Sequence, residues 1–163
     1  MTGDSAAAYL AGLEERLGAD GCTIEHTALG GVPALVARRS DFRLRWFATR
    51  LHLYTIAIVQ QTVDPYTLFH FSNDATRYAR QHKPGLPIGL QTGVAVFPVV
   101  VCAQPAPEAG QAAAARQRVE FSCMTRPVVV DAATGHAEWF QGKVYLGRAY
   151  AGHLVQRGRR YFG

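Results

Sequence analysis

The chain has 163 residues, 48% of them hydrophobic and 18% charged, with a formal net charge of +5 and a sequence pI near 9.4. This length suits one domain, and the composition is typical of an ordered globular protein and excludes a disordered chain. Lys83 and Lys143 are the only lysines, so arginine carries most of the positive charge, which favours anionic partners. A GC-rich genome also favours arginine codons, so the arginine bias has two explanations.

Turn and capping residues divide the first half of the chain. Gly30-Gly31 makes a hairpin connection, and Ser40-Asp41 is expected to turn the chain. Asp64-Pro65 places an N-cap residue before a proline at the first helical position, which predicts a helix start. The expected elements are, in chain order, a helix over 4–17, strands over 22–28 and 32–38, a long strand over 43–61, and a helix over 65–82.

The long strand changes phase along its length. Trp46 falls on one alternation of apolar residues, whereas Leu51 falls on the other. Because the side chains of a strand alternate strictly between its two faces, this shift predicts a bulge or bend near Thr49–Arg50, or a second half of the strand that is covered on both faces.

In the second half of the chain, Pro98 lies inside an apolar strand pattern. Because proline cannot donate a ladder hydrogen bond, this strand is expected to lie at a sheet edge, to be bulged or to end there. An edge strand would mediate self-association, so a homo-oligomer is a candidate state. The expected elements are a strand over 90–102, a short helix to about residue 118, strands over 121–124, 127–131 and 137–141, and a helix over 145–161. We therefore predict a single α+β domain over 1–163, with flanking helices and a mostly antiparallel sheet of about five or six strands.

Cysteine usage and hydropathy predict the compartment. Cys22, Cys102 and Cys123 are odd in number and lack C-x-x-C spacing, so neither a disulfide framework nor a zinc site is expected. The start of the chain has no basic segment followed by an apolar run, and the longest apolar run, 94–103, has about half the length of a membrane span. We expect a cytoplasmic protein with no membrane contact, no metal and no cofactor.

The segment 38–61 is the main candidate for a functional surface. Arginines and a histidine alternate there with bulky apolar residues, so one strand face is buried while the other presents guanidinium groups. The glycine-rich segment Gly85–Gly93 would let the backbone approach a ligand closely, but it lacks the Lys-Ser/Thr of a P-loop. The predicted anion- or partner-binding residues are Arg43, Arg45, Arg50, His52, Gln91 and Thr92.

Three functions are compatible with this surface. The sequence shows no catalytic motif, which favours a non-enzymatic binding or protein-interaction module whose partner is a protein or an anionic ligand. The first alternative is a small hydrolase or transferase acting on an anionic substrate, with His52, Asp41 or Cys123 supplying proton or nucleophile chemistry. The second is a nucleic-acid-binding domain that also uses the arginines of 157–160 to hold phosphates.

Two patterns that contain a carboxylate are candidate metal sites. His70 and Asp74 share one helix face, but two ligands do not complete a site. The order helix, three strands, helix, strand also occurs in the restriction-endonuclease-like core. Here Asp41 is followed by Arg43-Leu44-Arg45 instead of the acidic-x-lysine that holds a metal, so we assign the chain to no family.

Cys123 is a candidate nucleophile. His136 and His153 are candidate bases and Asp131 a candidate orienting group, since this chemistry needs all three residue types. No local signature surrounds the cysteine, and cysteine is among the most buried residue types, so an inert core thiol is the favoured interpretation.

Overall fold

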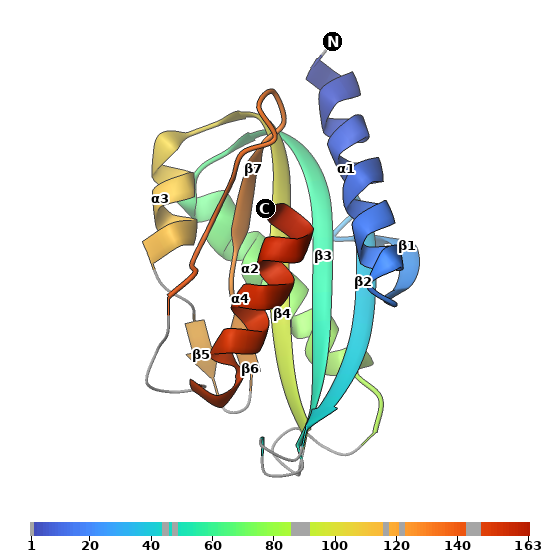
Figure 1. Ribbon diagram of the computed structural model, residues 1–163. Helices are drawn as coiled ribbons and strands as arrows, with labels where there is room; N and C mark the ends of the chain where they lie inside the picture. Colours follow the sequence, from blue (N-terminus) through green and yellow to red (C-terminus); the bar gives the residue numbers. More distant parts are fainter. Residues whose placement is uncertain are drawn as a thin grey trace.

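The computed structural model describes residues 2–43, 46, 49–85, 92–115, 118–120, 123–142 and 148–163. Over these residues the chain forms four helices and one mixed sheet of eight strands (Figure 1). The elements are α1 (Thr2–Ala19), β1 (Thr23–Leu29), β2 (Val32–Arg43), β3 (Thr49–Val63), α2 (Pro65–His82), β4 (Thr92–Pro105), α3 (Pro107–Ala115), β5 (Arg118–Glu120), β6 (Cys123–Thr125), β7 (Val128–Asp131), β8 (Ala137–Trp139) and α4 (Arg148–Phe162).

The predicted α+β architecture, a mostly antiparallel sheet with flanking helices, is confirmed. The strand order is β1-β2-β3-β4-β6-β5, and β7 pairs with both β4 and β8. Of the pairings in the described part of the chain, four are antiparallel, and the three that β4 makes are parallel. The strand that was not expected is β5, which has three residues, too few for a clear alternation.

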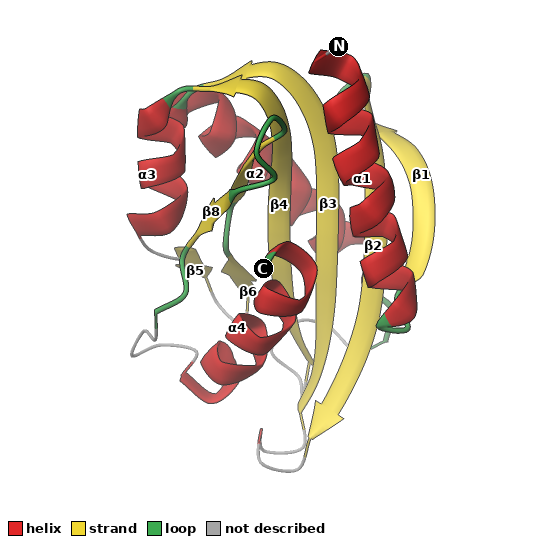
Figure 2. Ribbon diagram, turned by 45° about the horizontal axis from the view of Figure 1, so that its top comes forward, coloured by secondary structure: helices red, strands yellow, loops and turns green. Residues whose placement is uncertain are grey.

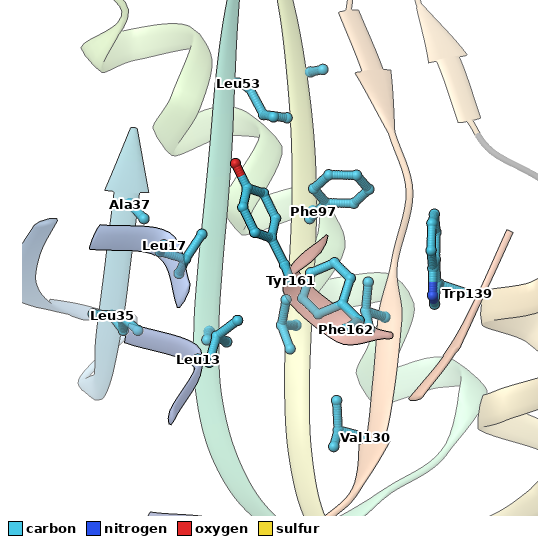
Figure 3. Packing of buried hydrophobic residues seen from close by; sticks show 14 of the residues in the cluster. Leu13, Leu17, Leu35, Ala37, Leu53, Phe97, Val130, Trp139, Tyr161 and Phe162 are labelled. Carbon is cyan, nitrogen blue, oxygen red and sulfur yellow. The ribbon is translucent and has the colours of Figure 1, made fainter. Parts of the chain in front are cut away.

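Two helical layers enclose the sheet, with α1 and α4 on one face and α2 and α3 on the other (Figures 1 and 2). The core under α1 and α4 includes Leu13, Phe97 and Phe162 (Figure 3), and the core under α2 and α3 includes Ile56 and Phe71. From 34 to 37 and from 51 to 58, the odd-numbered core residues of β2 and β3 face α1 and α4, whereas the even-numbered ones face α2. This alternation assigns the polar side chains between these positions to a face.

The second helix begins where the sequence predicts. Asp64 is its N-cap, and the Oδ1 atom of this residue accepts hydrogen bonds from the Thr67 amide at 2.7 Å and from the Thr67 hydroxyl at 2.5 Å. Pro65 occupies the first turn, where its missing N–H costs nothing. The helix connects the parallel strands β3 and β4 and ends at the C-cap residue Lys83.

The segment 32–63 is a hairpin and not a turn followed by one long strand. Arg43 and Thr49 are register partners, so β2 continues through Ser40-Asp41 and the chain reverses after Arg43. The turn expected at Ser40-Asp41 and the bulge expected near Thr49–Arg50 are therefore both wrong. The alternative explanation is confirmed, because residues 51–58 are all buried and β3 is thus covered on both faces. Ser and Asp are common turn residues, but here they lie within a strand, where Asp41 pairs with Arg39.

Pro98 lies in a central strand, so the expected edge, bulge or strand end is wrong. The ladder of β4 runs on to Pro105, with β3 on one side and β6 and β7 on the other. The Val96 carbonyl accepts from the Arg126 amide, so position 98, two residues on, faces the same side. There β6 pairs only with 94–96 and β7 only with 99–102. Pro98, which has no N–H, therefore lies between the stretch of β4 that pairs with β6 and the stretch that pairs with β7. Both edges of β4 are occupied.

Candidate functional site

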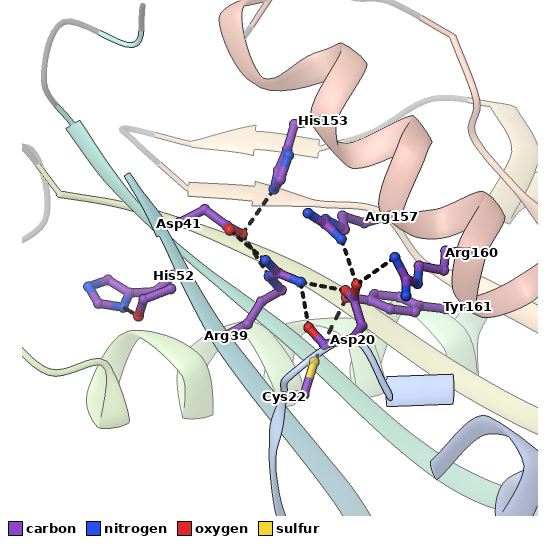
Figure 4. Close-up of polar contacts among 10 residues, drawn as sticks. Asp20, Cys22, Arg39, Asp41, His52, His153, Arg157, Arg160 and Tyr161 are labelled. Atoms are coloured by element: carbon purple, nitrogen blue, oxygen red, sulfur yellow. Dashed lines mark hydrogen bonds and ion pairs between the residues drawn. The ribbon is translucent and has the colours of Figure 1, made fainter. Parts of the chain in front are cut away.

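A buried network of charged side chains lies between α1, β2 and α4 (Figure 4). At its centre the Arg39 guanidinium bridges two carboxylates. Nη1 donates to Asp20 Oδ2 at 2.6 Å, while Nε and Nη2 donate to the two oxygens of Asp41 at 2.9 and 2.7 Å. Nε2 of His153, on α4, lies 3.0 Å from Asp41 Oδ2. We call this set the Asp20–Asp41 network; its members are Asp20, Arg39, Asp41, His153, Arg157, Arg160 and Tyr161.

Asp20 receives most of the donors of this network. Its side chain is 3% exposed and accepts from Arg157 Nη1 at 2.6 Å and from the Tyr161 hydroxyl at 2.5 Å, while Arg160 Nη1 lies 3.1 Å away. Burial alone would raise the pKa of Asp20, but the hydrogen bonds from Tyr161 and Arg39 lower it below its ordinary value. Two ionised carboxylates are thus matched by several cations, and the network ties the C-terminal helix to α1 and β2.

Asp41 and His153 form the other end of the network. Burial opposes the charge of Asp41, but hydrogen bonds from His153 and Arg39 hold the pKa of this carboxyl well below its ordinary value. The His153 ring packs edge-on against Trp46, with ring centroids 5.0 Å apart. Nδ1 of His153 is buried and has no hydrogen-bond partner in the part of the chain that the structure describes. This geometry fixes the ring in one orientation toward Asp41.

A second polar centre lies on the opposite face of the sheet, under the end of α2. Ser40 and His52 are register partners on β2 and β3, and Ser40 Oγ lies 2.7 Å from His52 Nδ1. Ser40 is exposed, whereas His52 is only 2% exposed. His52 lies apart from the Asp20–Asp41 network (Figure 4). The hairpin register therefore holds an accessible hydroxyl against a shielded imidazole.

Positive charges surround this pair. Burial lowers the pKa of His52 below its ordinary value, and the charges of Arg50, Lys83 and Arg38 lower it further. Arg38 and Arg50 each lie two residues from the pair along their strands, about 7 Å away and on the same face. We call these five residues, Arg38, Ser40, Arg50, His52 and Lys83, the Ser40–His52 site. The imidazole is neutral near pH 7, so the site presents cations, a hydroxyl and an uncharged ring.

The structure brings some of the predicted site residues together. Arg50 is exposed, with its guanidinium carbon 5.9 Å from the centroid of the exposed Phe42 ring. Thr92 begins β4 as the register partner of Arg50 and is buried. The other predicted residues are Arg45 and Gln91, which lie outside the described residues, and Arg43, which ends β2 and whose side chain is likewise not described.

The candidate segment 38–61 included Arg38 and Ser40, but neither of them, nor Lys83, was among the predicted binding residues. The missing information was the hairpin register. With Ser40 assigned to a turn, nothing placed its hydroxyl opposite His52, and Lys83 approaches only because α2 folds back over β3. An alternation of Arg38, Ser40 and Phe42 on one strand face was the available signal.

The alternative catalytic groups do not converge. Asp41 lies on the face of α1 and α4, so the sheet separates it from His52. Cys123 belongs to the core under α2, whereas its candidate base His153 contacts Asp41 on the other face. Asp131 lies at the β7–β8 turn, where its Oδ1 accepts from the Ala133 amide at 2.9 Å.

His70 and Asp74, which share one helix face, each contact other residues. Asp74 Oδ1 lies 3.3 Å from Arg77 Nη1, and the His70 ring packs against Tyr66 with centroids 4.2 Å apart. Within the described residues, no group of three or more His, Cys, Asp or Glu side chains is arranged to hold a metal ion.

The C-terminal arginines divide into two groups. Arg157 and Arg160 contact Asp20, and Arg157 is only 14% exposed, so Arg157 is engaged inside the protein. Arg159 is exposed and donates to Gln141 Oε1 at 3.3 Å. Much of the charge at this end of the chain therefore serves internal pairing.

Comparison of the chain with models of known protein families, with curated proteins and with solved structures finds no match. Of the helices in the described ranges, none combines the length and the apolar character needed to cross a membrane.

Proposed function

We propose that this protein is a binding module for a small anionic ligand, bearing phosphate or carboxylate, at the Ser40–His52 site. The observation that supports this proposal most directly concerns the pKa of His52. Arg50, Lys83 and Arg38, which are all positively charged, each lower it. Arginine suits planar, bidentate recognition of phosphate and carboxylate, and the Ser40 hydroxyl adds a neutral donor.

The contrast with the Asp20–Asp41 network supports this choice. Arg39 lies between two carboxylates at hydrogen-bonding distance, so its charge is matched within the protein. At the Ser40–His52 site, by contrast, the charges that act on the imidazole are positive, which is a setting that attracts an anion. The proposal names a small ligand because the exposed part of the site, Ser40 and Arg50, spans only neighbouring positions on two strands.

The test is a titration of the protein with inorganic phosphate and, separately, with succinate, followed by the NMR signals of the His52 ring. We expect saturable changes for at least one anion. We expect Arg50→Gln to weaken binding about tenfold, because a hydrogen bond to a charged group contributes on the order of 1.5–3 kcal/mol.

The matched control is Arg159→Gln, which removes one exposed arginine on the opposite face. It should leave the affinity unchanged. A His52 signal that neither anion moves, or an equal loss in both variants, would overturn the proposal. Salt-sensitive retention on heparin that Arg50→Gln abolishes would identify a nucleic-acid backbone as the ligand instead.

A further inference from the structure

We propose that Ser40 and His52 form a nucleophile–base pair that hydrolyses carboxylic esters carrying a negative charge. This inference rests on the proposed function, because the anionic group of the ester would occupy the binding site formed by Arg38, Arg50 and Lys83. It adds a reaction to a site that is otherwise a binding site.

The geometry meets the first requirement of serine chemistry. A nucleophile and its base must lie within hydrogen-bond reach, and Ser40 Oγ and His52 Nδ1 are 2.7 Å apart. The two burial states are complementary: Ser40 is exposed and reaches a substrate, while His52 is 2% exposed and shielded from water. Adjacent antiparallel strands hold both residues, so the pair is built on rigid elements and not on a loop.

The reaction proceeds in two balanced steps. Ser40 Oγ attacks the ester carbonyl carbon, its proton passes to His52 Nδ1, and the C–O bond to the alcohol breaks as the alcohol takes that proton. The acyl group is then bound to Ser40. Water attacks the acyl carbon, gives one proton to His52 Nδ1, and releases the carboxylic acid as Ser40 Oγ regains the proton.

The surrounding charges predict which esters react. Arg38, Arg50 and Lys83 oppose a positive charge on His52, so the pair is a poor base when the site is empty. A bound anionic group offsets those charges and lets the imidazole accept the proton. The same cations stabilise the negative oxygen that develops on the carbonyl. An ester with a negative group should therefore react faster than an uncharged ester of the same acyl group.

The experiment compares two acetate esters, 4-acetoxybenzoate and its uncharged methyl ester. We expect kcat/KM for the anionic ester to exceed that for the neutral one, although the neutral ester has the better leaving group. We expect Ser40→Ala to lower the rate about 100-fold or more, the scale of lost general-base and nucleophile chemistry. Intact mass spectrometry should find one acetyl group on the wild type, and peptide mapping should place it on Ser40.

The matched control is Ser5→Ala, on α1, which should retain the wild-type rate. His52→Gln should abolish turnover as Ser40→Ala does, with thermal unfolding as the check that both variants fold. Phosphate binding without hydrolysis above the Ser40→Ala rate would overturn this inference and leave the proposed function intact. If the wild type neither bound phosphate nor hydrolysed the ester, both the proposed function and this inference would be overturned. Acetylation at another residue would overturn the role of Ser40.

Discussion

The two faces of the β2–β3 hairpin carry similar residues in opposite electrostatic settings. On the α1/α4 face, Arg39 lies between Asp20 and Asp41 and forms an ion pair with each of them. On the α2 face, His52 lies among positive charges and is held neutral. Matched buried charges connect α4 firmly to α1 and β2, whereas the positive charges near His52 disfavour protonation of its ring. The comparison therefore links one face to stability, and it is the other face for which we propose ligand binding.

The largest expected effect comes from removing the carboxylate that several donors share. Asp20→Asn leaves Arg39 and Arg157 without one of their charged partners in a buried site. Breaking a buried ion pair from one side typically costs about 3–5 kcal/mol, and we expect a loss of that order in the free energy of unfolding. Urea unfolding monitored by circular dichroism measures it.

Asp74→Asn is the matched control, because Asp74 is half exposed and its ion pair is with the exposed Arg77. It should change the free energy of unfolding by less than about 0.5 kcal/mol. If the two variants had the same free energy of unfolding, the Asp20–Asp41 network would not be a major source of stability. Asp20→Asn should also leave phosphate binding at the opposite face unchanged.

A smaller effect is expected from pH acting on Asp41. The pKa of this carboxyl is lower in the folded state than in the unfolded state, so it contributes stability above its ordinary pKa of about 3.9. That contribution, about 2 kcal/mol at neutral pH, is lost as the pH falls below this value. We expect the difference in unfolding free energy between wild type and Asp41→Asn to shrink from pH 7 to pH 3. A difference that stays constant over this range would show that Asp41 acts through packing alone.

Much of the fold was readable from the sequence, because its main elements carry local signals. Asp64-Pro65 begins α2 as predicted, and the Gly30-Gly31 connection lies between β1 and β2, where both glycines adopt positive φ. The central position of β4 was not readable. A proline in a strand normally indicates an edge, and only the junction of β6 and β7 beside Pro98 removes the penalty. That junction depends on strands of three and four residues far along the chain.

The candidate site was only half predictable for a related reason. Composition and alternation identified Arg50 and His52, since both lie on a strongly β-prone segment. Ser40 is identified only by its register opposite His52, and register depends on where the chain reverses. Pairing between distant segments, such as Asp20 with Arg157, leaves no trace in a single sequence.

The smallest predicted effect tests the α2 face most directly. Removing a positive neighbour should raise the pKa of His52 toward its ordinary value, more for Arg50→Gln than for Arg38→Gln, because Arg50 contributes the larger charge effect. Both variants should leave that pKa below about 6.5, since burial remains the principal cause of the shift. NMR titration of the His52 ring at low salt measures these changes, and added salt should reduce them. Arg159→Gln, on the opposite face, should leave the titration of His52 unmoved. If all three variants titrated like the wild type, the charges around His52 would be screened by solvent, and the distinction between the two faces would fail.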